Sequence, residues 1–115
     1  MARSAITITD VSQNADNTLT ADAFDITNNH SIDVSDTSCV ELKVIIETLD
    51  TKAAVFDIKA GDGQAADQGD LSITTGAAGK HIFSLDSARF KDNDGLILID
   101  ITSAASATGN IYALV

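Results

Sequence analysis

Aromatic residues, proline and cysteine are scarce in this sequence of 115 residues, which has four Phe, one Tyr, no Trp, no Pro and one Cys. The single Cys39 excludes an intramolecular disulfide and a zinc site built from several cysteines. Aromatic side chains bury the most surface per residue, so the core is expected to be thin. Proline is a common protection of exposed sheet edges, so charge or a partner must cover them here.

Positive charge is also scarce. Seven Lys and Arg stand against 17 Asp and Glu, which gives a net charge of −10. Contacts to nucleic-acid phosphates or to an anionic membrane surface need clustered Lys and Arg, so we expect neither partner. No stretch approaches the roughly 20 apolar residues of a membrane-spanning helix. No apolar segment follows the first residues, so we expect no secretory signal.

The acidic residues are almost all Asp, with 15 Asp and only two Glu. Asp is typical of turns and caps, whereas Glu favours helices. Together with many Thr and Ser, this composition indicates short strands joined by polar turns. The length fits one domain, residues 1–115, with a short N-terminal arm.

Alternation of apolar and polar residues predicts the strands. It is clearest from Val40 to Thr48, where every second residue is apolar. The predicted strands are Val40–Thr48, Ala53–Lys59, Lys80–Leu85, Gly95–Ile101 and Asn110–Leu114, with weaker ones at Ala5–Thr9, Leu71–Ile73 and around Phe24–Ile26 and Ile32–Val34. Gly95–Ile101 is apolar on both faces, which indicates a central strand.

Turns complete the predicted architecture. Leu49–Lys52 and Asp92–Gly95 are expected to be hairpin turns, and Ser87–Phe90 one turn of helix. The predicted fold is all-β, an antiparallel β-sandwich of about eight short strands, similar to a jelly roll. Its expected core is Leu42, Val44, Ile46, Phe56, Ile58, Phe83, Leu98 and Ile111.

Few residues could carry catalysis. Cys39 is the only thiol, and His30 and His81 are the only imidazoles. A Cys–His pair is formally possible, but Cys39 at a strand start is more typical of a small buried side chain. His81 alternates with Phe83 and Leu85, which indicates a strand histidine. No nucleophile, phosphate-binding or zinc motif occurs, so we expect a protein that is not an enzyme and has no cofactor.

Residues 60–70 form the most distinctive loop, with Asp62, Asp67 and Asp70 among three glycines. Carboxylates on a flexible loop could wrap Ca²⁺. The spacing departs from the EF-hand pattern, and no Glu closes the loop. A glycine-bearing turn between strands is the favoured interpretation, and Ca²⁺ binding by these three residues stays open.

Several segments resemble, in order along the chain, those of a group of small virion proteins of tailed bacteriophages. The segment from Phe24 to Ile32 is similar to a pattern D-x-T/A-N-G-H, and Leu85 to Phe90 is similar to L-E-S-A/G-R-F. The other resembling segments are Ala5–Asp10, Val55–Asp62, Gly69–Ile73 and Thr108–Ala113. Two departures stand out: Asn29 replaces a glycine, and the loop after Asp62 lacks the family's proline and aromatic residues.

The resemblance implies a protein that decorates and stabilises the outside of a capsid. Its partners would be the major capsid protein and copies of itself, with a homotrimer as the implied state. It would be made in the host cytoplasm and end on the capsid surface. The alternatives are a tail or other minor virion protein and, in another class, a secreted Ca²⁺-dependent adhesion or sugar-binding module.

We expect contacts at the N-terminal arm and at two loops. Ile6 and Ile8 alternate with Thr7 and Thr9, so this arm could add a strand to a neighbour. Loops at sandwich ends commonly carry binding residues. The predicted loop residues are Asn28, Asn29, His30, Gly61, Asp62 and Gly63. Arg89 is expected to be structural, with its guanidinium holding two acidic loops together.

Overall fold

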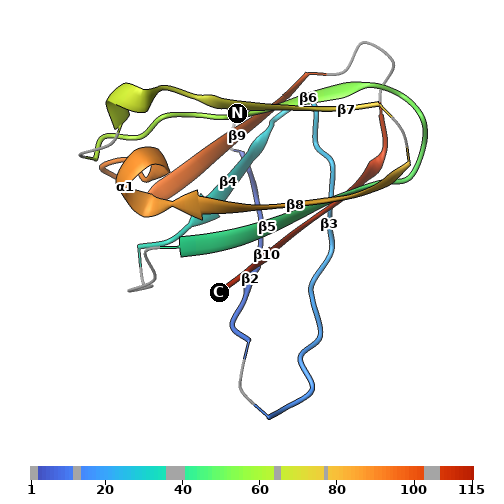
Figure 1. The fold of residues 1–115 in the computed structure, drawn as a ribbon, viewed down its shortest axis with the longest axis horizontal. Coiled ribbons are helices and arrows are strands. Elements are labelled where there is room, and N and C mark those ends of the chain that lie inside the picture. The colour runs from blue at the N-terminus through green and yellow to red at the C-terminus, as the bar shows by residue number, and fades with distance from the viewer. Residues whose placement is uncertain (1–2, 12–13, 36–40, 64–65, 77, 103–106) are drawn as a thin grey trace.

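The computed structural model describes residues 3–11, 14–35, 41–63, 66–76, 78–102 and 107–115. It is an all-β protein with two sheets that enclose one core (Figure 1). The first sheet has the strand order β1-β4-β9-β6-β7, and the second has β2-β10-β5-β8, with β3 also paired to β10.

The strands of the first sheet are β1 (Ser4–Ala5), β4 (His30–Asp33), β6 (Ala54–Ile58), β7 (Leu71–Thr75) and β9 (Leu96–Thr102). Those of the second are β2 (Ile8–Thr9), β3 (Asp22–Ala23), β5 (Glu41–Thr48), β8 (Gly79–Asp86) and β10 (Gly109–Leu114). A 3-10 turn, η1 (Ala66–Gln68), and one helical turn, α1 (Ser87–Phe90), complete the fold.

The strongly alternating strands form as predicted, within one or two residues of the expected ends. β5 buries Leu42, Val44 and Ile46, while Glu41 and Lys43 face solvent. Alternation specifies these strands because a half-buried sheet exposes every second side chain to water. Val40 and Cys39 lie outside the described residues. The helical turn at Ser87–Phe90 also forms, with Asp86 as its N-cap.

Two of the weaker strands differ from prediction. The N-terminal segment, residues 4–9, divides into β1 and β2 in different sheets, with Ile6 buried between them. The strand predicted around Phe24–Ile26 lies earlier, at β3. It ends before Asp25, because the Asp25 N–H donates a hydrogen bond to the His30 ring. The antiparallel prediction holds for most pairs, but β1–β4 and β2–β10 are parallel.

Two expected hairpin turns instead join different sheets. Residues 49–52 lead from β5 in the second sheet to β6 in the first. Asp50 accepts hydrogen bonds from the Thr108 N–H (3.0 Å) and hydroxyl (2.7 Å), which fixes this link to the start of β10. Asp92–Gly95 does form a turn, with Gly95 at φ 80°, but it connects α1 to β9.

The core contains most of the expected residues and corrects one. Leu42, Val44, Ile46, Phe56, Ile58 and Ile111 are buried, and Phe83 packs against the core while partly exposed. Leu98 is only partly buried, because the core face of β9 carries Ile97, Ile99 and Ile101 instead. β9 lies in the middle of its sheet, as its two apolar faces predict. Because both faces are apolar, the sequence does not show which set of alternate residues points into the core.

Candidate interaction surfaces

The N-terminal segment is held inside its own chain by a polar cluster. Ser4 donates its hydroxyl to Asp25, which also accepts from the N–H groups of Thr27 and Asn28. These hydrogen bonds, with that of Ser4 contributing most, lower the pKa of Asp25 to about 2. Asp25 is therefore ionised at neutral pH and fixes the turn that precedes β4.

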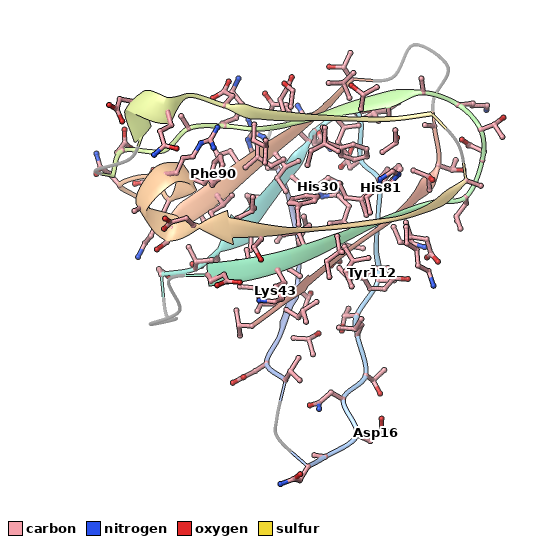
Figure 2. All side chains as sticks on the ribbon, viewed as in Figure 1. Asp16, His30, Lys43, His81, Phe90 and Tyr112 are labelled. Carbon is pink, nitrogen blue, oxygen red and sulfur yellow. The ribbon has the colours of Figure 1, made fainter. Side chains whose placement is uncertain are left out.

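His30 lies in this cluster and is buried, with 1% of its surface exposed (Figure 2). Its Nε2 accepts from the Asp25 N–H at 3.0 Å, so Nδ1 must carry the proton that it donates to the Ser4 carbonyl at 3.2 Å. Burial lowers the pKa of His30 and keeps it neutral, although nearby Asp25 and Asp22 act the other way. His30 is thus part of the core, which corrects its predicted place on a contact loop.

Arg3 was not among the predicted site residues, and it links β4 to β9 at this end of the first sheet. Its guanidinium forms an ion pair with Asp100 at 2.6 Å and donates to the carbonyls of His30 and Ile99. Asn29 has φ 62° and accepts from the Ile101 N–H at 2.9 Å. A left-handed position suits Asn or Gly, so Asn29 fits this conformation.

The predicted strand donor is therefore already paired. Ser4 and Ala5 pair with β4, and Ile8 and Thr9 pair with β10. Ile6 is buried, and the Thr7 N–H donates to Asp22 at 2.9 Å. The arm is not a free strand in this structure, which corrects the expectation drawn from its alternation.

Gly61 and Gly63 pack against the helical turn α1. A Cβ built on Gly61 would lie 2.1 Å from the Lys91 carbonyl oxygen, and one on Gly63 would lie 2.4 Å from that of Ala88. Asp62 is exposed, and its side chain accepts from the Asn93 N–H at 3.0 Å. The two glycines allow the loop between β6 and β7 to approach the α1 backbone, so they have a structural role here.

Arg89 is structural but uses different acceptors from those expected. Its Nε donates to the Gly69 carbonyl at 3.0 Å and its Nη2 to the Asp70 carbonyl at 3.3 Å. The guanidinium also lies 4.7 Å from the centre of the Phe90 ring. It therefore joins α1 to the β6–β7 loop through backbone oxygens, where two acidic side chains were expected.

The three Asp residues of the β6–β7 loop are not gathered into one site. Asp70 pairs with Lys59 at 2.8 Å and accepts from the Ala60 N–H, and these contacts lower its pKa. Asp62 bonds to the turn after α1. In the described residues, no group of three His, Cys, Asp or Glu side chains is placed to hold a metal ion.

A pocket of about 340 Å³ is lined by Glu41, Ser84, Leu85 and Asp86. Its two carboxylates lie on paired positions of β5 and β8. Hydrogen bonds from Lys43 and Ser84 lower the pKa of Glu41, whereas a general acid needs a raised one. Asp86 accepts from the Ala88 N–H as the cap of α1. Both side chains therefore serve the fold.

The outer face of the second sheet carries an apolar row that crosses three strands. Tyr112 on β10 is opposite Ile45 on β5, which is opposite Ile82 on β8. Ile82 is 66% exposed. Ile45 and Ile82 occupy positions where alternation calls for polar residues, and that signal was present in the sequence. Figure 2 shows Tyr112 and Lys43 on this side of the molecule.

A long loop between β2 and β3 extends away from both sheets (Figure 1). This protruding loop comprises residues 10–11 and 14–21 of the described chain, with Asp16 near its far end (Figure 2). It exposes Val11 (45%) and Leu19 (36%). Leu19 returns beside the apolar row, where it lines a pocket of about 190 Å³ with Ile45, Lys80 and Tyr112. This loop was not predicted, because two isolated apolar residues in a polar stretch give no periodic signal.

No protein-family model, curated protein or solved structure matches this chain. None of the helices in the described part is long and apolar enough to cross a membrane.

Proposed function

We propose that this chain is a non-enzymatic structural protein of a bacteriophage virion, and that it decorates and stabilises the capsid exterior by binding the major capsid protein. The ordered resemblance of its segments to small phage virion proteins supports this proposal. Those segments also join one another in the fold: Asp25 and His30 secure the N-terminal segment, and Arg89 holds Gly69.

One observation carries the proposal: the polar side chains of the resembling segments bind other parts of the same chain. Asp25, His30, Asp70 and Arg89 all have partners within the fold. A protein that performs no turnover can commit its polar groups to stability, which a thin core needs. What it requires for function is an exposed surface that contacts a partner.

The protruding loop is the part of the surface best suited to that contact. It extends from the body and exposes Val11 and Leu19 to solvent. Loops on a rigid scaffold commonly carry binding residues. Modest contacts repeated over many copies would hold the protein on a shell, and the net charge of −10 would keep the decorated particle soluble.

Binding to capsids of the encoding phage, prepared without this chain, tests the proposal. Purified protein is co-sedimented with these shells, and Val11→Asp is compared with Leu49→Asp, a control at another exposed apolar residue (60%). We expect binding by the original chain and the control, and at least about a tenfold weaker binding by Val11→Asp. No binding by the original chain would contradict the function. Equal binding by all three would remove the protruding loop as the contact.

The resemblance also implies a homotrimer, which stays a prediction. Sedimentation equilibrium of the free protein measures that state directly.

A further inference from the structure

β8 is the longest open edge of the two sheets. Its eight residues, Gly79–Asp86, pair one for one with β5 on one side. In the described part of the chain, no strand pairs with its other side. The other edges are shorter: β7 has five residues, and β1, β2 and β3 have two each. Proteins usually blunt such an edge with proline, a bulge or several charges, and β8 has no proline and no bulge.

The side chains of β8 are self-complementary about Phe83, which lies next to the midpoint of the strand. On the outer face, Lys80 lies three residues before Phe83 and Asp86 three residues after it. Antiparallel pairing of two β8 strands centred on Phe83 would place Lys80 opposite Asp86 at both ends. Lys80 is available for this contact, since its side chain is 71% exposed and its own partner, Glu47, lies 3.8 Å away.

The same register matches the apolar residues. Phe83 is only partly buried at the open side of the core, and it would lie opposite Phe83 of the second copy. Such cross-strand aromatic pairs stabilise antiparallel sheets. Ile82, which is 66% exposed, would lie opposite Ser84 and close to the second Ile82. The pairing would therefore cover exposed apolar surface on both faces of the sheet.

We propose that β8 is a self-association site, where two copies of this chain join their second sheets edge to edge about a two-fold axis at Phe83. Main-chain hydrogen bonds between the strands give the contact its strength, and the two Lys80–Asp86 pairs set its register. This inference goes beyond the proposed function, since it concerns only the free protein. It predicts a dimer, whereas the phage resemblance implies a trimer.

Cysteine cross-linking tests the register. In a Cys39→Ser background, Ile82→Cys and Ser84→Cys are prepared as separate chains, both at exposed positions. We expect a disulfide-linked dimer when the two chains are mixed and oxidised, and less from either chain alone, because residue 82 lies directly opposite residue 84 and only diagonally from residue 82 of the second copy. Ser72→Cys mixed with Thr74→Cys is the matched control on the shorter edge β7, where we expect no comparable product.

Sedimentation equilibrium of the full chain tests the charge pairs. Lys80→Glu places two carboxylates opposite each other at each end, so we expect dimer dissociation to become at least about tenfold easier. Lys43→Glu is the control, since it also loses an ion pair with a Glu of its own chain but lies on the inner strand β5. We expect it to dimerise like the original chain.

A monomer at all concentrations would overturn the proposal, and would leave a strand of another protein as the occupant of this edge. A trimer without the 82–84 cross-link would overturn it in favour of a three-fold contact elsewhere. Capsid binding by a purely monomeric chain would leave the proposed function standing while this inference fails.

Discussion

His30 shows how one buried polar residue can secure a chain segment. Its two ring nitrogens bond to the backbone of Ser4 in β1 and of Asp25 in the turn segment before β4. The bond from the Asp25 N–H requires the neutral ring, because Nε2 must accept it, whereas Nδ1 can donate to the Ser4 carbonyl in either protonation state. Protonation would remove that acceptor and place a charge in the core, which is costly without a new partner.

Stability should therefore fall on mild acidification. The unfolded chain has an ordinary histidine pKa near 6.5, and burial lowers the pKa of His30 in the folded chain. The unfolded state then binds the proton first as pH falls, so this contribution is complete above 6.5 and is lost below it. The slope from this one group can reach at most about 1.4 kcal/mol per pH unit.

Urea unfolding between about pH 7.5 and 5.5 measures this effect, above the range where carboxylates titrate. We expect the free energy of unfolding to fall over this range in the original chain and in His81→Gln, the matched control at the other histidine. The His30→Gln chain should be less stable throughout but much less dependent on pH. An equal pH dependence in His30→Gln would contradict the role assigned to His30.

Phe56 is the largest fully buried side chain among the described residues. It is fully buried on β6, and its ring contacts Phe24 edge to face at a centroid distance of 5.1 Å. Phe56→Ala should lower the free energy of unfolding by about 3–5 kcal/mol, because it leaves a cavity and removes the aromatic pair. Leu49→Ala, at an exposed position, should change it by less than about 0.5 kcal/mol. Chemical denaturation measures both, and a loss below about 1 kcal/mol for Phe56→Ala would contradict its burial.

At the scale of elements, Gly61 decides whether the β6–β7 loop can reach α1. The Gly61 N–H donates to the Arg89 carbonyl at 2.8 Å, and a Cβ would overlap the Lys91 carbonyl oxygen. Gly61→Ala should therefore move the loop from α1 and cost about 1–3 kcal/mol. Gly76→Ala is the matched control, since its Cβ would meet nothing within 4 Å. Thermal unfolding compares the two variants, and equal melting temperatures would show that the loop does not need this approach.

Alternation predicted the long strands but not the sheet to which each belongs. The links at residues 49–52 and 92–95 have turn residues, yet each leads from one sheet to the other. Turn residues in a sequence indicate only that the chain changes direction. Which sheet the next strand joins depends on which apolar faces pack together. The division of the N-terminal segment has the same cause, because burial of Ile6 outweighs continuation of one strand.

Several of the predicted contact residues bind other parts of their own chain. Asn29, His30 and Gly61 occur in polar or glycine-bearing segments, which are typical of binding loops. The same residue types also satisfy backbone groups and permit close packing, as they do here. The apolar row was visible in the sequence as Ile45 and Ile82 at polar positions, but the joining of Tyr112 to that row depends on strand register.

At the scale of the whole molecule, the polar clusters stabilise the fold, while several other features face solvent. Its polar clusters hold the N-terminal segment, the β6–β7 loop and α1 in place. The protruding loop, Ile82 of the apolar row and the β8 edge are exposed. The two proposals use these exposed features, the loop to bind the shell and the edge to bind a second copy.

Location on purified phage particles tests the central claim most directly. Intact particles of the encoding phage are reacted with a membrane-impermeant amine label and then analysed by mass spectrometry and by electron cryomicroscopy. The account predicts that this chain is present in many copies, that its exposed Lys52 is labelled on intact particles, and that density of its size lies outside the capsid shell. Purified particles that lack the chain, or that hold it only in the tail or inside the shell, would contradict the account.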